Sequence, residues 1–187
     1  MKALVIIAVL AAAPAVAQRT DTAPRPIQIA ATAPAACVIR GAAAGAGVNA
    51  TFVSTGPNSA NVQIVQLVDP STALPRASSL TVQLPVLCNS AHTLTVRSGQ
   101  GGLLRAGGNQ RNTSPGGFGE FLPYRLSASW AGQTTTAASN AAGPLIIRAS
   151  DGGAGTAEVG FQILAGGAPL VAGAYSDAIV VEFAVAN

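Results

Sequence analysis

The chain has 187 residues, of which 49% are hydrophobic and only 9% are charged. This length allows one sandwich-sized domain with a real core, but not two. The net charge of +3 arises from ten basic and seven acidic residues that are scattered along the chain. Such a distribution gives no footprint for nucleic acid or for an anionic membrane surface.

The first 17 residues have the pattern of a secretory signal peptide. Lys2 supplies the charged start, residues 4–13 form the apolar core, and Ala15-Val16-Ala17 is the small-residue cleavage site. The apolar run is too short to span a bilayer, and Gln18 stands where a lipoprotein would carry cysteine. We therefore expect export through the periplasm and no transmembrane segment in the mature protein.

Residues 18–36 form an N-terminal extension that does not resemble a domain. Pro24, Pro26 and Pro34 exclude a helix and disfavour a central strand. Apolar side chains nevertheless recur with the period of a strand, at Ile27, Ile29, Ala31 and Ala33. The segment is either a disordered linker or a strand that completes the sheet of another molecule.

The two cysteines, Cys37 and Cys88, are predicted to form a disulfide. Export leads to an oxidising compartment, the number of cysteines is even, and both share strand parity with apolar neighbours. Closing a loop of about 50 residues would stabilise the fold by roughly 4 kcal/mol on the loop-entropy model. Free thiols or half of a metal site fit less well, because His92 is the only histidine.

The domain predicted for residues 37–187 is a series of short strands separated by polar turns. Strand patterns occur at residues 37–40, 48–54, 61–68, 79–88, 92–98, 121–130, 145–148, 158–164 and 179–185. The glycine-rich or small polar stretches 41–47, 99–119 and 131–143 are expected to be loops. The short turn 89–91 predicts a hairpin between its flanking strands. Because no helical period follows the signal peptide, these patterns predict a single antiparallel β-sandwich.

The last predicted strand, residues 179–185, has a clear two-residue period. One face carries Ile179, Val181, Phe183 and Val185. This is the pattern of a strand with one buried face, and Ser176-Asp177 supplies the turn before it. We expect this face to share a core with Leu122, Tyr124 and Leu126. A strand of this kind needs two neighbours, and we expect one of them to come from outside the domain.

Residues suited to catalysis are scarce. A single histidine leaves little for a metal cluster or a catalytic triad, and no acidic pair has motif spacing. The glycine-rich stretches lack the strand–turn–helix context of a phosphate loop. Trp130 and the two tyrosines fall within or beside strand patterns, which favours the core over a sugar-stacking platform. The sequence predicts neither an enzyme nor a cofactor.

Three segments resemble the spore coat protein U family, whose members include subunits of archaic chaperone–usher pili. They are Phe121-Leu122-Pro123-Tyr124-Arg125-Leu126, the run Ala172-Gly173-Ala174-Tyr175-Ser176-Asp177 before the last strand, and Val86-Leu87-Cys88-Asn89. Val68-Asp69-Pro70 occupies the place of the family's aromatic-Asp-Pro turn, and the Phe-Gly element that precedes this turn in the family is absent. The resemblance extends over residues 37–187.

The resemblance implies an incomplete immunoglobulin-like sandwich that lacks its last strand. A periplasmic chaperone would fill the acceptor groove until an outer-membrane usher adds the N-terminal extension of a neighbouring subunit. Burial of the two isoleucines and two alanines of this donor strand would contribute about 4–8 kcal/mol before any backbone hydrogen bonds. The groove and core would include Leu122, Tyr124, Leu126, Tyr175, Ile179, Val181, Phe183 and Val185.

The expected function is therefore that of a structural subunit of a surface fibre. Two alternatives remain: a spore or cell coat protein with the same fold, and a secreted carbohydrate-binding or adhesive module that folds alone. The extension distinguishes a fibre subunit from a self-contained module, because an autonomous module has no use for a donor strand.

Overall fold

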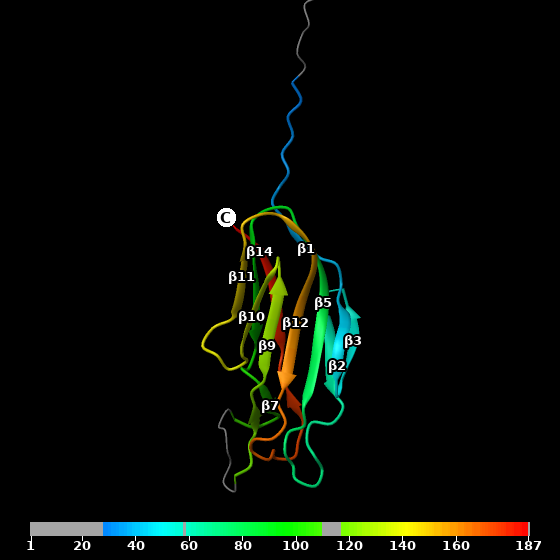
Figure 1. Ribbon diagram of the computed structural model, residues 1–187, viewed down its shortest axis with the longest axis vertical. Coiled ribbons are helices and arrows are strands. Elements are labelled where there is room, and N and C mark those ends of the chain that lie inside the picture. Colours follow the sequence, from blue (N-terminus) through cyan, green and yellow to red (C-terminus); the bar gives the residue numbers. More distant parts are fainter. Residues whose placement is uncertain (1–27, 58, 110–116, 187) are drawn as a thin grey trace, which may run out of the picture. The chain divides into compact units, whose positions relative to one another are not determined.

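The computed structural model describes residues 28–57, 59–109 and 117–186 (Figure 1). The described residues belong to two units, one that includes residues 28–33 and one that begins at residue 34. The proposed signal peptide lies outside the described residues, and residues 28–33 have no regular secondary structure. The described part of the second unit contains strands and no helix, so the prediction of an all-β fold is confirmed. No described helix is therefore long and apolar enough to cross a membrane.

The larger sheet has the strand order β1-β5-β12-β9-β10, and β2 also pairs with β5. Its strands are β1 (Cys37–Ile39), β2 (Ala43–Val48), β5 (Ser78–Cys88), β9 (Arg125–Trp130), β10 (Gln133–Ala138) and β12 (Gly153–Ile163). All of these pairings are antiparallel. Figure 1 shows β9, β12 and β5 side by side at the front of the domain.

The second sheet has the order β11-β6-β14 and is also antiparallel. It consists of β11 (Leu145–Ala149), β6 (His92–Ser98) and β14 (Ile179–Val185). The described residues also form two smaller sheets. One combines β13 (Tyr175–Ser176), β7 (Leu103–Arg105) and β8 (Phe121–Leu122), and the other pairs β3 (Ala50–Gly56) with β4 (Ser59–Ile64).

The two main sheets share one hydrophobic core, so they form a sandwich. Leu84 and Val86 of β5 belong to the same buried cluster as Leu94 and Val96 of β6. Inward-facing residues of β9, β11 and β12 belong to the same cluster. The single-core sandwich expected from the chain length is therefore present.

The expected hairpin between the strands on either side of residues 89–91 is wrong. β5 pairs with β1, β2 and β12, whereas β6 pairs with β11 and β14 of the other sheet. The short link is therefore an arch between the two sheets. Alternation places Cys88 and His92 on inward faces in either arrangement, and for this reason the sequence pattern did not distinguish the arch from a hairpin.

Three segments expected to be loops contain strands: β2, β7 and β10. The glycines of β2 allow its backbone to approach β5 closely. A Cβ atom on Gly47 would lie 2.6 Å from Leu80 Cδ1, and one on Gly45 would lie 3.0 Å from the Thr81 carbonyl oxygen. Glycine at positions 45 and 47 therefore suits the close packing of β2 on β5, although the composition of the segment is typical of a loop.

The segment 121–130 forms two strands and not the single strand expected. β8 ends at Leu122 and β9 begins at Arg125, so Pro123 and Tyr124 lie between them. Proline cannot donate a hydrogen bond to a strand ladder, which explains the break. The backbone N–H of Tyr124 instead donates to Ser139 Oγ at 2.9 Å.

Candidate strand-pairing site

The outer edge of β14 is the feature that best fits a binding function. β14 pairs with β6 along its whole length, from Ile179 opposite Ser98 to Val185 opposite His92. Among the described residues, no strand pairs with its other edge. Its remaining backbone N–H and C=O groups are thus arranged to accept a further strand.

The inner face of β14 is apolar and only half-buried. Val181 and Phe183 pack against the core, and the Phe183 ring lies edge-on to Trp130 with 5.4 Å between ring centroids. Val185 is also half-buried, whereas Ile179 is 37% exposed. The expectation that Ile179 is buried is therefore wrong, because the face is less covered at the start of the strand.

The other predicted core residues lie on or near β8 and β9. Tyr124 and Leu126 are buried as expected, at 6% and 3% exposure, and Leu122 is partly buried against the same core. β1 of the larger sheet also lies close to β14, and its Ile39 is only partly buried. Partly exposed apolar side chains therefore occur on both strands that meet at this side of the sandwich.

The start of β14 is held by the carboxylate of Asp177. Tyr124 Oη donates to Asp177 Oδ2 at 2.8 Å, and the Ser98 hydroxyl donates to the same oxygen. The backbone N–H of Gln100 donates to Oδ1 at 2.9 Å. Burial, and then the hydrogen bond to Asp177, raises the pKa of Tyr124. The sequence indicated only a turn at Asp177. The strand pattern around Tyr124 predicted a buried tyrosine, but it did not show that the tyrosine hydroxyl would bind Asp177.

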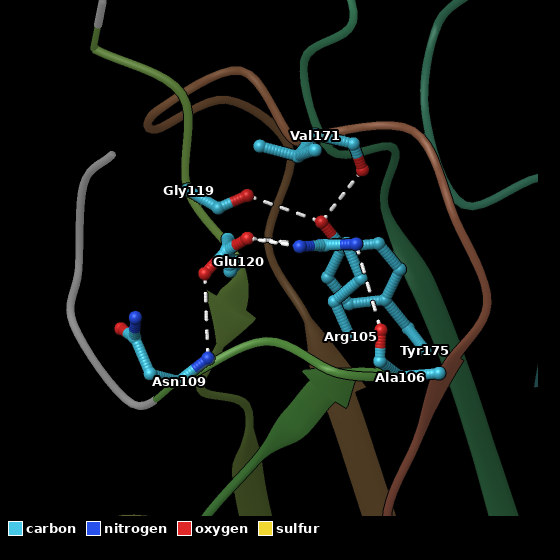
Figure 2. Close-up of polar contacts among 7 residues, drawn as sticks. All are labelled: Arg105, Ala106, Asn109, Gly119, Glu120, Val171 and Tyr175. Carbon is cyan, nitrogen blue, oxygen red and sulfur yellow. Dashed lines mark hydrogen bonds and ion pairs between the residues drawn. The ribbon is translucent and has the colours of Figure 1, made fainter. Parts of the chain in front are cut away.

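Tyr175 lies in β13, outside β14, and takes part in a different polar cluster. Figure 2 shows its hydroxyl between the carbonyl oxygens of Gly119 and Val171, at 3.1 and 2.8 Å. Burial raises the pKa of Tyr175. Beside it, Arg105 forms an ion pair with Glu120, and this hydrogen bonding lowers the pKa of the carboxyl group. These groups are paired with one another, as expected of a cluster that fastens β7 to the chain before β8.

The predicted disulfide between Cys37 and Cys88 is confirmed. These residues are directly opposite each other in the β1–β5 ladder, with Cα atoms 4.1 Å apart. Cys88 is 2% exposed, and Cys37 is partly buried against the core. The bond fixes β1 at the edge of the larger sheet.

The predicted donor segment is described only in part. Ile27 lies outside the described residues. Ile29 is 91% exposed, and Ala31 and Ala33 are exposed as well. The segment from residue 28 to residue 36 has no strand of its own.

Two surface hollows of the described part of the chain are lined by residues outside β14. One, of about 690 Å³, is bounded by residues 121–125, 136–138, 140, 164–168 and 170. The other, of about 580 Å³, is bounded by residues 91–93, 131, 133, 148–153 and 186. Neither brings together side chains with the geometry of a catalytic group.

None of the protein-family models, curated proteins or solved structures compared with the chain matches it.

Proposed function

We propose that this protein is a structural subunit of a surface fibre, completed by a strand that a neighbouring subunit donates. In this proposal the domain is an immunoglobulin-like sandwich without its last strand. The donated strand pairs with the outer edge of β14. The observation that carries the proposal is an apolar strand whose outer edge has no strand partner among the described residues.

Edge strands of soluble domains are usually protected against pairing by charges, prolines, bulges or short length. β14 has seven residues, contains no proline, and carries Glu182 as its only charged side chain. On its outward face, the side chain of Val180 is 37% exposed to solvent. These properties favour a strand that is covered in the functional protein.

The N-terminal extension has the properties of the missing partner. Its alternating stretch, residues 27–33, has the same length as β14, and seven extended residues span about 23 Å. Ile29 is available for insertion because it is 91% exposed. Two isoleucines and two alanines on one face would complement the half-buried inner face of β14 by strand addition.

Donation of this kind produces a head-to-tail contact, which does not close on itself and therefore generates a filament. The proposal includes a periplasmic chaperone that covers the β14 edge before assembly and an outer-membrane usher that joins the subunits. The resulting fibre lies at the cell surface. A secreted coat would use the same contact.

The test replaces Ile29 by aspartate in the full chain, co-expressed with its chaperone and usher. Ile29→Asp places a charge in the neighbour's core and should abolish fibres in electron micrographs. The matched control is Gln28→Asp, which adds the same charge on the opposite face and should leave fibres intact. Export levels of both variants should equal those of the wild type.

Normal fibres from Ile29→Asp would refute donation by this segment. A wild-type chain that stays monomeric and stable without any chaperone would favour the self-contained adhesive module. Loss of fibres in both variants would refute the assignment of Ile29 to the face of the donor segment that enters the neighbouring subunit.

A further inference from the structure

The chain just before β1 is held by one side chain, that of Asn89. This residue follows the last residue of β5, where the main chain leaves the larger sheet for the arch. Its Oδ1 accepts a hydrogen bond from the backbone N–H of Ala36 at 2.7 Å, and its Nδ2 donates to the Pro34 carbonyl oxygen at 2.8 Å. Its backbone N–H also donates to the Ala36 carbonyl oxygen at 3.0 Å.

The side-chain amide of Asn89 takes the place of a further peptide group of β5. It supplies one acceptor and one donor, as a backbone amide would if the strand continued. In an extended chain, alternate residues direct their backbone groups to the same side. Pro34 and Ala36 are alternate residues that both bind Asn89, so residues 34–36 continue the line of β1. Proline also has a fixed φ and disfavours helical backbone at the residue before it, which stiffens this stretch further.

Residues 34–36, which we call the root of the extension, lie at the end of the domain where β14 finishes. The backbone N–H of Ala186 donates to the Ala91 carbonyl oxygen at 2.9 Å, so β14 ends on the same arch that begins with Asn89. β1 also lies close to β14. If the root formed a turn, residues 27–33 of the same chain would run back beside β14. A loop of three residues is long enough for such a turn, so chain length does not prevent it.

We propose that Asn89 decides which molecule receives the extension. By holding the root straight, it keeps the extension away from the β14 edge of its own chain and leaves it for a second copy. This inference rests on the proposed function. A turn in the root would move the Pro34 carbonyl group away from Asn89 and break that hydrogen bond. Asn89 is a positioning residue, and its side chain is exposed, so its replacement removes no core packing.

The experiment measures binding of a fluorescent peptide of residues 18–36 to the freshly refolded, monomeric full chain. Asn89→Ala removes two hydrogen bonds, each worth about 2–10-fold, so self-insertion should compete and weaken peptide binding by roughly 5–50-fold. Asn89→Asp can still accept from Ala36 but has no proton for Pro34, and its effect should be smaller. Adding Ile29→Asp to Asn89→Ala should restore wild-type affinity, because the charged segment cannot enter its own groove. A damaged fold would not be rescued in this way.

Hydrogen exchange of residues 28–33 gives a second readout, in which the wild type should exchange rapidly and Asn89→Ala slowly. Slow exchange in the wild-type monomer, or equal peptide affinity of the wild type and Asn89→Ala, would overturn the role of Asn89 and leave strand donation standing. Failure of the double variant to recover would also overturn it. Absence of peptide binding in every chain, the double variant included, would instead refute strand donation and this inference together.

Discussion

β6 and β14 are neighbouring strands of one sheet, yet the strand with fewer apolar residues is the more deeply buried one. β6 has the sequence HTLTVRS and contains two aliphatic residues, Leu94 and Val96, both 0% exposed. β14 has the sequence IVVEFAV, with one polar residue, and no side chain in it is fully buried. The more apolar strand is the less buried one.

The difference follows from the number of neighbours. β6 lies between β11 and β14, whereas β14 has one strand neighbour among the described residues. Hydrophobicity shows which faces can be buried, but partners decide which faces are buried. The described chain leaves the apolar side chains of β14 only partly buried. These exposed apolar side chains are the physical basis of the proposed function.

The largest effect is expected from Leu94→Ala in β6. A fully buried leucine leaves a cavity when it is truncated, so the free energy of unfolding should fall by about 3–5 kcal/mol. Urea denaturation followed by tryptophan fluorescence would measure it. A fall below about 1 kcal/mol would contradict the assignment of β6 to the centre of the core.

Phe183→Ala in β14 should have a smaller effect in the isolated domain, about 1–3 kcal/mol, because its ring is only partly covered. The loss of unfolding free energy caused by Phe183→Ala should be larger when a synthetic peptide of residues 18–36 is bound, since the peptide would bury the exposed part of the Phe183 ring. Denaturation with and without peptide provides the comparison. Equal costs in both conditions would mean that the peptide does not reach Phe183.

Tyr124→Phe removes a hydrogen bond to the Asp177 carboxylate and should cost about 1–2 kcal/mol near neutral pH. The raised pKa of Tyr124 also predicts a pH dependence. The folded state holds the phenol proton more tightly, so this stabilisation is complete below the ordinary pKa of 10.0 and is lost as the pH rises above it. The variant should therefore show a shallower alkaline loss of stability than the wild type, and an unchanged slope would count against the contact.

The smallest effect is expected from Val180→Thr on the outward face of β14. Val180 is 37% exposed, so the free energy of unfolding should change by less than about 0.5 kcal/mol. A thermal melt of the isolated domain would suffice. A loss comparable to that of Phe183→Ala would show that the outward face is covered as well.

The sequence predicted the inward face of each strand better than it predicted which strands pair with one another. Alternation located β5, β6, β11 and β14 nearly to the residue, because each strand has one inward face and most inward residues are apolar. Alternation is the same whether the next strand pairs beside β5 or crosses to the opposite sheet. The arch at residues 89–91 was therefore mistaken for a hairpin.

Segments with small side chains were the other failure. β2 and β10 are rich in glycine, alanine and threonine, and their strand state depends on contact with β5 and β9. For the candidate site, the sequence predicted only that residues 179–185 form a strand with one apolar face. The role of Asp177 depends on Tyr124 and Ser98, which lie far from it in the chain and meet it only in the folded domain.

The ladder between β5 and β12 has a consequence for how the domain folds. These strands pair over eleven residues, from Gly153 opposite Cys88 to Ile163 opposite Ser78, although β6 to β11 lie between them in the sequence. Closing so long a loop costs entropy before the ladder returns any stabilisation, so such topologies fold slowly, in about milliseconds to seconds. During synthesis from the N-terminus, β5 is therefore made long before β12, and the backbone edge of β5 that pairs with β12 has no partner until the later strand has been added.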